Sequence, residues 1–322
     1  MKKLVAAVLC AAALTSSTAS AQDYPSRIVK FIVPFGPGGP ADVAARLLAK
    51  DMQESTKQSF IVENRTGAGA VIGTGEAAKA TPDGYTLLVI SNTQTANESL
   101  IPTRNYELMR DFVAISPINE SDLVIVAHPS VNAKTVQELV ALAKAQPGKL
   151  NYASSGQGTP YHMAGELFKA MTGTNIVHVP HRNSGEARAS VLGGQVEIMI
   201  DAVPAMAQNI ASGQVRAIAT TGKKRSAVLP DVPTVDEAGV PGYEATIWLG
   251  LVAPKDTPKS VVDKLAAEMK AVVSKPENVK MWASQGALPM SMTPAEFDKY
   301  LREDIVKWAG VVKLINESSG KK

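Results

Sequence analysis

The stretch over residues 28–42, IVKFIVPFGPGGPAD, decides how this chain folds. Its β-branched beginning, residues 28–33, predicts a strand, the glycines and prolines of residues 35–40 predict a tight loop, and a helical pattern begins at Ala41. A chain that turns from a strand through glycines into a helix leaves backbone N–H groups unpaired at the helix start. Because these groups converge at the positive end of the helix dipole, the loop predicts an anion-binding site.

The same alternation of short apolar segments and longer helical ones continues along the chain. We predict strands over residues 28–33, 60–63, 86–91, 123–127, 150–153, 176–179, 196–200, 215–220 and 247–253. We predict helices over residues 41–54, 70–80, 136–145, 161–171, 185–192, 204–212, 258–274, 276–285 and 294–317. Glycine, proline, asparagine and aspartate fill most of the gaps. The pattern indicates an α/β fold with mainly parallel sheets.

The first residues are typical of an export signal. Two lysines precede an apolar run over residues 4–14, which is too short to span a bilayer, and Ala19-Ser20-Ala21 fits the small-residue cleavage rule. We therefore predict a signal peptide over residues 1–21, cleaved near Ala21, and a periplasmic location; a retained membrane anchor is the alternative. The single cysteine, Cys10, lies in the apolar run, so the mature chain has no disulfide and no cysteine chemistry.

The remaining length of about 300 residues is enough for two domains of ordinary size. Removing Lys2 and Lys3 lowers the formal net charge from +3 to +1. No basic stripe appears, so the sequence predicts no nucleic-acid partner. No later segment is long and apolar enough to cross a membrane, which predicts a soluble exported globular protein.

The chain has no long linker, so we expect two α/β lobes that exchange strands. The strands predicted over residues 123–127 and 247–253 are the candidates for these crossings. Lobe 1 would then comprise residues 22–121 and 249–322, and lobe 2 residues 122–248. Such an arrangement places a cleft between the ends of the strands, where open α/β sheets bind ligands. Near the chain end, Thr257 and Thr293 are predicted helix caps, and Trp308 is predicted to pack in the core.

The glycine loop supplies the first predicted wall of this cleft. Proline has no N–H, so the backbone donors are those of the glycines and Ala41. Asp42 either caps the helix or holds an ordered water on the ligand, and the alternative for the whole loop is a tight turn that binds nothing. Ser91, which ends the strand over residues 86–91, is also a candidate. The ligand-binding candidates of this wall are Phe35, Gly36, Gly38, Gly39, Asp42 and Ser91.

A second glycine-rich segment, residues 64–73, also follows a predicted strand. It lacks the G-x-G-x-x-G spacing and an acidic residue about 20 positions further on, and no G-K-[ST] phosphate loop occurs in the chain. The sequence therefore argues against a nucleotide. We expect these glycines to permit close packing beneath a helix.

A third segment, residues 151–159, mirrors the first because it follows a strand and precedes a helix. Helix starts from opposite lobes can together hold the two ends of a dianion; simple helix capping by Ser155 or Thr159 is the alternative. Arg182 can grip a carboxylate with two parallel hydrogen bonds, unless it is a solvated loop residue. Asp201 ends a strand and can orient a water or a ligand ammonium. The candidates of this wall are Ser154, Ser155, Gly158, Thr159, His181, Arg182, Asn183 and Asp201.

No motif in the sequence predicts catalysis or a cofactor. His178 and His181 are three residues apart, but Pro180 disfavours a helix there and no third metal ligand is visible. No G-x-S-x-G elbow appears, and Ser154 and Ser155 have no evident base in the sequence. We predict no metal, no cofactor and no catalytic residues. Tyr243 and Trp248 can face the cleft, although packing in the core or hinge is the simpler interpretation.

Several segments together resemble the periplasmic substrate-binding proteins of tripartite tricarboxylate transporters, the Bug receptor family. The resemblance spans nearly the whole mature chain. Its segments are Val33-Pro34-Phe35 with Gly38-Gly39 and Asp42, Val62-Glu63-Asn64-Arg65 with Gly67-Ala68-Gly69, Pro82-Asp83-Gly84-Tyr85-Thr86-Leu87-Leu88, Asp111-Phe112, Asn151-Tyr152-Ala153-Ser154, His178-Val179-Pro180, Gly193-Gly194-Gln195-Val196, Pro230-Asp231-Val232-Pro233-Thr234 and Glu237-Ala238-Gly239.

This resemblance implies a two-lobe periplasmic-binding-protein fold of the Venus-flytrap type II, with two crossing hinge strands. It also implies no cofactor, a monomer, and delivery of a small carboxylate to membrane subunits of a transporter. The binding wall of the family would map onto residues 35–42, opposed by residues 154–159 and the loop after His178. There the family commonly has an aromatic residue, lysine and glycine, whereas this chain has His181-Arg182-Asn183. The change suggests a strongly anionic or aromatic carboxylate.

We therefore expect a receptor for a di- or tricarboxylate, an amino acid or an aromatic carboxylate. Three alternatives remain open at this point. The chain could be a periplasmic serine hydrolase that uses Ser154 or Ser155, or the ligand-sensing lobes of a transcription regulator, which the export signal disfavours. It could also be an accessory that presents its ligand to a membrane sensor kinase.

Overall fold

A mixed β-sheet flanked by helices forms the frame of the protein. The computed structural model describes residues 24–284 and 286–318, so the predicted signal peptide lies outside the described residues. The strands are β1 (Val29–Val33), β2 (Phe60–Asn64), β3 (Thr86–Ser91), β4 (Phe112–Ala127), β5 (Asn151–Ser154), β6 (Val177–Pro180), β7 (Ile198–Ala202), β8 (Arg216–Thr220), β9 (Thr246–Pro254) and β10 (Ala287–Pro289). The helices are α2 (Pro40–Thr56), α3 (Val71–Ala78), α4 (Asn92–Leu100), α5 (Leu108–Asp111), α6 (Val136–Ala145), α7 (Pro160–Thr172), α8 (Ser184–Leu192), α9 (Val203–Ala211), α10 (Lys259–Val273), α11 (Pro276–Ser284) and α12 (Pro294–Ser318).

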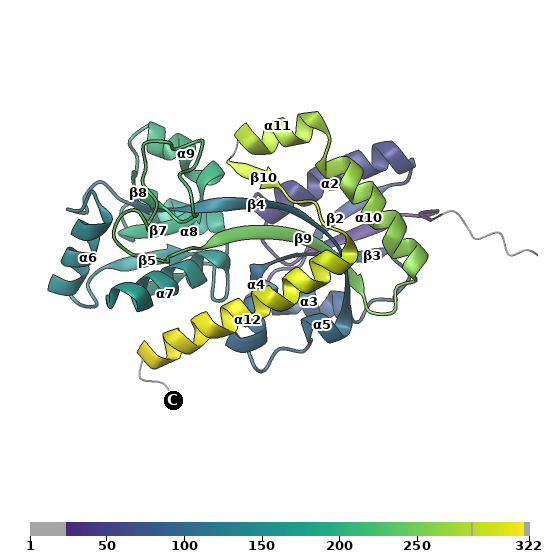
Figure 1. The fold of residues 1–322 in the computed structure, drawn as a ribbon, viewed down its shortest axis with the longest axis horizontal. Helices are drawn as coiled ribbons and strands as arrows, with labels where there is room; N and C mark the ends of the chain where they lie inside the picture. Colours follow the sequence, from purple (N-terminus) through teal and green to yellow (C-terminus); the bar gives the residue numbers. More distant parts are fainter. Residues whose placement is uncertain (1–23, 285, 319–322) are drawn as a thin grey trace, which may run out of the picture.

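The sheet has the strand order β2-β1-β3-β9-β4-β7-β5-β6, with β8 and β10 also paired to β4. The outer pairs β1–β2, β1–β3, β5–β6 and β5–β7 are parallel, whereas every pair that involves β4 or β9 is antiparallel. The expectation of mainly parallel sheets therefore holds for the outer strands of each half but not for the centre. Figure 1 shows the resulting two lobes, with β4 and β9 passing from one to the other.

Strand β4 is the element that belongs to both lobes. Its first part pairs with β9 from Phe112 to Asp122, and its last part, from Leu123 to Ala127, pairs with β7 and β8. The sequence predicted only residues 123–127, because Pro117 and the polar run that follows it lack a strand pattern. The pairing with β9 is irregular at two places in this first part, between Ala114 and Ser116 and between Pro117 and Asn119. Tertiary pairing thus imposes a strand where local propensity does not favour one.

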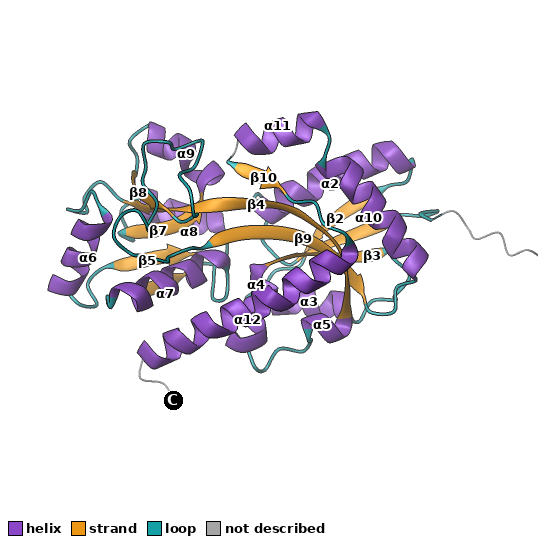
Figure 2. Ribbon diagram, in the orientation of Figure 1, coloured by secondary structure: helices purple, strands orange, loops and turns teal. Residues whose placement is uncertain are grey.

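Helix α12 runs along both lobes (Figure 2). Its N-terminal half packs in one apolar cluster with Trp248 of β9, which meets the rings of Phe297 and Tyr300 edge to face. Its C-terminal half, including the buried Trp308, packs in the core of the second lobe. The burial of Trp308 confirms the expectation of core packing.

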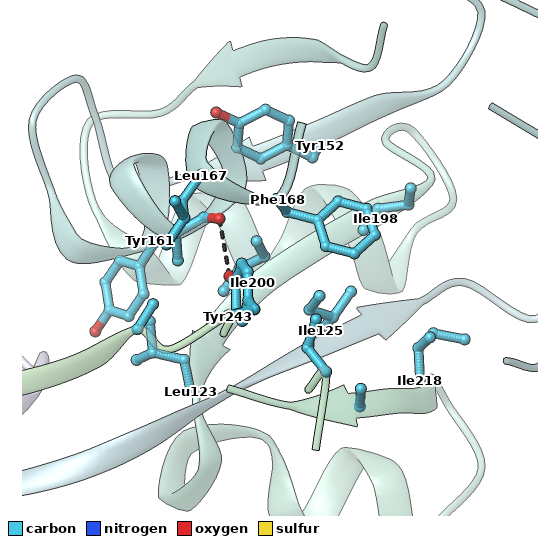
Figure 3. Packing of buried hydrophobic residues seen from close by; sticks show 14 of the residues in the cluster. Leu123, Ile125, Tyr152, Tyr161, Leu167, Phe168, Ile198, Ile200, Ile218 and Tyr243 are labelled. Carbon is cyan, nitrogen blue, oxygen red and sulfur yellow. Dashed lines mark hydrogen bonds between the residues drawn. The ribbon is translucent and has the colours of Figure 1, made fainter. Parts of the chain in front are cut away.

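The core of the second lobe gathers side chains from β4, β5, β7 and β8 against α6 and α7. Figure 3 shows Leu123, Ile125, Ile198 and Ile200 packed between strands and helix. The Tyr243 hydroxyl donates to the carbonyl oxygen of Ala164 at 2.9 Å. Tyr243 therefore belongs to this core.

Helix α4 has no counterpart among the predicted elements. Its sequence, NTQTANESL, is polar, yet Asn92, Thr93 and Gln94 are buried. The helix begins at Ser91, whose hydroxyl oxygen accepts from the Thr93 N–H while the Gln94 side chain accepts from the Ser91 N–H. Capping and tertiary contacts, rather than an apolar stripe, create this helix.

Two predicted helix caps have different outcomes. Thr293 caps α12, since its hydroxyl oxygen accepts from the Glu296 N–H and the Glu296 carboxylate accepts from the Thr293 N–H. The prediction for Thr257 was wrong: its hydroxyl donates to the Pro254 carbonyl oxygen, and Pro258 precedes α10 without a side-chain cap.

Asp122 lies in β4 at the junction of the two lobes and makes a first prediction possible. Its burial, with the charges of Glu120 and Glu244 nearby, raises its pKa to about 6. Above this pH the ionised group therefore destabilises the folded protein, and the cost disappears as the pH falls toward about 4, where the unfolded chain is also protonated.

We expect Asp122→Asn to raise the free energy of unfolding at neutral pH by about 1 to 3 kcal/mol, with the gain vanishing toward about pH 4. Urea unfolding across this pH range measures the effect. Asp231→Asn, at an exposed position, is the matched control and should change little. If Asp122→Asn has the same free energy of unfolding as the native chain at neutral pH, the ionised Asp122 does not destabilise the folded protein.

Candidate functional site

A cavity of about 400 Å³ lies between the two lobes. Three of its wall segments belong to the first half of the sheet: the loop before α2, the loop before α3, and Ser91 at the end of β3. The loops before α7 and α8 form the opposite wall, and Ile247 and Leu249 of β9 close the floor. Segments far apart in sequence thus meet around one space because β4 and β9 hold the two halves of the sheet together.

Five helices begin at this cavity. The N-cap residues of α2, α3, α4, α7 and α8 all line it, and they are Gly39, Ala70, Ser91, Thr159 and Asn183. The N-terminal end of a helix carries unpaired N–H groups and a partial positive charge. Within the described residues, no protein acceptor takes the N–H of Gly39 or of Ala41. The arrangement favours an anion, and a carboxylate in particular.

The loop before α2 is held in place by Asp42. The Asp42 carboxylate accepts from the Gly38 N–H at 2.9 Å, from the Asn64 side chain at 2.9 Å and from Arg46, whose Nε lies at 3.0 Å. Asn64 also donates to the Phe35 carbonyl oxygen. Burial alone would raise the pKa of Asp42, but these hydrogen bonds outweigh it and the pKa lies below its usual value. Asp42 therefore acts as an ionised anchor of the loop.

The loop before α3 forms a larger part of the cavity than the sequence predicted. Thr66, Gly67, Ala68, Gly69 and Ala70 all line the space, and the last four of them have positive φ angles. We expected these glycines only to allow close packing. A strand followed by glycines and a helix start, the same pattern as in residues 28–42, was the signal that could have identified this wall.

On the opposite wall, Thr159 caps α7 and accepts from the His162 N–H. Its hydroxyl donates to the Gly156 carbonyl oxygen at 2.7 Å, which fixes the turn that carries Ser155. Gly158 donates its N–H to His162 Nδ1 at 3.2 Å. The turn is thus held from behind by buried groups while Ser155 and Gly156 face the cavity.

Arg182 is the only side chain with a fixed charge among the described residues that line the cavity. No carboxylate of the described chain pairs with its guanidinium, whereas every other described arginine except Arg216 pairs with one. Arg216 instead donates to the carbonyl oxygens of Val131 and Ala133. Arg182 therefore keeps its donors free for a ligand.

Nine of the fourteen predicted ligand-binding residues line the cavity: Phe35, Gly36, Gly39, Ser91, Ser155, Thr159, His181, Arg182 and Asn183. The other five do not. Gly38 lines a neighbouring cavity, and Asp42 anchors its loop. Ser154 and Gly158 lie buried behind the wall, and Asp201 is paired with Arg188. Each of these last three is held by a hydrogen bond within the protein: Ser154 with His178, Gly158 with His162, and Asp201 with Arg188.

The lining residues that the sequence analysis did not propose include Tyr161, Ile247 and Leu249. Ile247 and Leu249 face the cavity from β9, whereas Trp248 between them points into the core, as alternation along a strand requires. Tyr161 of α7 also lines the cavity, and Figure 3 shows its hydroxyl directed away from the packed core. These residues give the site an apolar floor beside its polar walls.

Ser154 and His178 form a serine–histidine pair that the sequence did not reveal. Ser154 Oγ lies 2.6 Å from His178 Nε2, but Ser154 is 0% exposed and also bonds with Gly156. Within the described residues no carboxylate hydrogen-bonds to His178, so no orienting third member of a triad is present. The pair supports the turn before α7.

The described residues also contain no group of three or more potential metal ligands and no helix long and apolar enough to cross a membrane.

The chain belongs to the tripartite tricarboxylate transporter receptor family, whose sequence profile matches residues 44–317. The protein BugT of Bordetella pertussis is 37% identical over 311 residues, which cover 96% of this chain and 95% of BugT. The family is one of periplasmic solute-binding receptors, and the fold described above, with two lobes around a cavity, is the one that these receptors share.

Solved structures agree with this assignment. R. palustris Rpa4515 with adipate superposes with a TM-score of 0.88 at 32% identity, over 91% of this chain and 99% of that chain. MatC from Rhodopseudomonas palustris with bound malate superposes with a TM-score of 0.85 at 30% identity, over 90% of this chain and 100% of that chain. The two-lobe fold predicted from the sequence is thereby confirmed.

A second prediction concerns the histidines behind the wall. Burial and the charge of Lys169 lower the pKa of His162 to about 4, and burial together with the charge of His162 lowers that of His178 to about 3. The two rings lie 4.3 Å apart between centroids, and His162 Nδ1 must stay unprotonated to accept from Gly158. The unfolded chain takes up protons near pH 6.5 and the folded chain does not.

The free energy of unfolding should therefore fall as the pH drops from about 6.5 toward about 4, by up to about 3 kcal/mol for His162. His162→Asn keeps an acceptor for the Gly158 N–H but cannot titrate, so we expect a shallower decline in urea unfolding over this range. His128→Asn, on the outer end of the same lobe, is the control. If the free energy of unfolding falls equally steeply with pH in His162→Asn and in the native chain, the lowered pKa of His162 is refuted.

Proposed function

We propose that this protein captures a small organic carboxylate in the cavity between its lobes. The observation that carries the proposal is the convergence of five helix N-termini, together with the unpaired Arg182, on one space with an apolar floor. A carboxylate placed there accepts hydrogen bonds from backbone N–H groups and from the Arg182 guanidinium, while Ile247 and Leu249 contact the carbon atoms of the ligand. The adipate and malate of the related structures are ligands of this chemical class.

The division into residues 22–121 with 249–322, and residues 122–248, remains our proposal for the two moving lobes. It is supported by the change of pairing partner along β4, at Asp122 and Leu123. We propose that the lobes close by a hinge in β4 and β9, because a ligand shifts this equilibrium only if it touches both walls in the closed state.

We further propose that the chain is exported by its signal peptide, acts as a monomer and delivers the ligand to transporter membrane subunits, without catalysis. Two alternatives from the sequence remain distinguishable. A serine hydrolase would turn over esters, but the buried Ser154 and its lack of a triad speak against it. A sensor accessory would bind the same ligand, and a pull-down with the membrane subunits separates it from a transport receptor.

Isothermal titration calorimetry against di-, tri-, amino-acid and aromatic carboxylates tests the proposed function. We expect at least one ligand to bind, and Arg182→Gln to weaken it by about tenfold, which corresponds to the loss of one charge-assisted interaction. Arg225→Gln, which breaks an exposed pair with Glu237 outside the cavity, should leave the affinity unchanged. If no carboxylate binds the native chain, the proposal fails.

Closure makes a separate prediction, because a Cβ atom on Gly36 would lie 3.0 Å from Asn183 Cβ in the opposite wall. Gly36→Val should hold the walls apart and lower affinity by about tenfold or more. Asn183→Gly removes the opposing Cβ, and glycine is an acceptable N-cap, so the double variant should recover affinity.

Small-angle scattering supplies the second measurement for these variants. The native chain should become more compact when the ligand is added, and Gly36→Val should not. An unaltered affinity in Gly36→Val, or a loss that Asn183→Gly does not reverse, would show that this contact does not limit closure.

A further inference from the structure

A second cavity, of about 220 Å³, adjoins the proposed ligand cavity. Both spaces are lined by Pro40, Ile247 and Leu249, so these three side chains form the boundary between them. The second cavity continues along α2 to Val43 and Ala44 and is closed on the other side by Pro204 and Ala205 of α9. Trp282 of α11 and Ala287 of β10 also line it. The start of α2 therefore divides one interlobe cleft into two chambers.

Arg188 of α8 is the one charged side chain among the described residues that line this second chamber. Its Nε donates to Asp201 Oδ2 at 2.5 Å, and the Asp201 carboxylate is 0% exposed. A guanidinium has five N–H donors, and within the described residues no acceptor takes the remaining four of Arg188. The Arg188 side chain lines this chamber and is only 21% exposed, so its remaining donors are largely shielded from solvent.

The rest of the chamber is mostly apolar. Val43, Ala44, Ala205 and Trp282 offer carbon surface, and Asn119 and Ser121 of β4 add the remaining polar groups. A space with this composition suits a ligand segment that is apolar along its length and ends in an acceptor of hydrogen bonds. The Asp201 charge offsets that of Arg188, so an uncharged carbonyl oxygen is as acceptable there as a carboxylate.

We infer that the second chamber receives the far end of an elongated ligand whose first carboxylate lies at the helix N-termini. This inference rests on the proposed function and adds a distal subsite to it. The ligand would pass beside Pro40, its chain would contact Ile247 and Leu249, and a terminal carbonyl or carboxylate oxygen would accept from the free Nη groups of Arg188. The ligand class is a straight-chain carboxylic acid with a second oxygen-bearing end.

The test compares ligands of increasing length by calorimetry on the full mature chain. The probes are succinate, adipate, suberate and sebacate, the half-amide of the best of these, and the monocarboxylate of equal length. We expect affinity to rise by about tenfold once the far oxygen reaches Arg188, relative to the monocarboxylate. Equal affinity of half-amide and diacid would identify a carbonyl subsite, and a preference for the diacid a carboxylate subsite; each supports the chamber.

Two variants locate the effect. Ala205→Phe fills the second chamber from α9 without touching the first, and Arg188→Lys keeps an ion pair with Asp201 while removing the fork of donors. Both should abolish the gain of the long ligand and leave the affinity for succinate unchanged. Circular dichroism and urea unfolding verify that each variant is folded.

Three outcomes would overturn the inference. Long ligands with a second oxygen could bind no better than monocarboxylates, both variants could leave their affinity intact, or both could weaken short and long ligands equally through impaired closure. If short carboxylates bind and only the long-ligand gain is missing, the distal subsite fails and the proposed function stands. If no carboxylate binds at all, the proposed function itself fails.

Discussion

The antiparallel pairing of β4 with β9 is the constraint on which the rest of the structure depends. These two strands lie between the outer parallel strands of both lobes, and β4 changes its partners from β9 to β7 and β8 as it crosses. Because the strands are shared, the loops at the strand ends of both halves face one space. Successive side chains of β9 point to opposite faces of the sheet, so that Trp248 packs in the core while Ile247 and Leu249 form the cavity floor.

The electrostatic character of the cavity comes mainly from backbone groups. Five helix starts contribute partial positive charge, and Arg182 is the one fixed charge among the described lining residues. Backbone N–H groups are fixed in position by the helices they begin, so little side-chain freedom is lost when an anion binds. Such a site recognises the carboxylate that many ligands share, and the apolar floor and the neighbouring chamber are left to distinguish their remaining parts.

Buried polar side chains hold these loops in position from behind. Asp42 ties the loop before α2 to Arg46 and Asn64, while His162 and the Ser154–His178 pair support the turn before α7. Each of these groups is polar, near the site and plausible as a ligand contact when only the sequence is seen. Their burial and their hydrogen bonds instead make them supports, because a buried polar atom needs a partner within the protein.

The sequence by itself determined the class of fold and the two main walls. The alternation of strands and helices, the glycine loop of residues 35–42 and the segment of residues 154–159 are local patterns, and local patterns report which residues start helices. Arg182 was predicted from its place after a strand end and from the chemistry of its guanidinium, and it lines the cavity together with Asn183. The resemblance to the receptor family, carried by motifs along most of the mature chain, was confirmed by the family assignment.

Only the tertiary structure decided which polar groups face the ligand and which support the walls. Asp201 lies at a strand end, as expected, but pairs with Arg188 on α8, a residue that no local pattern links to it. Helix α4 and the first part of β4 form because distant segments bury or pair with polar stretches. The part of the cavity wall formed by the loop before α3, and the second chamber, depend on contacts between residues far apart in the chain. Sequence periodicity carries no information about such contacts.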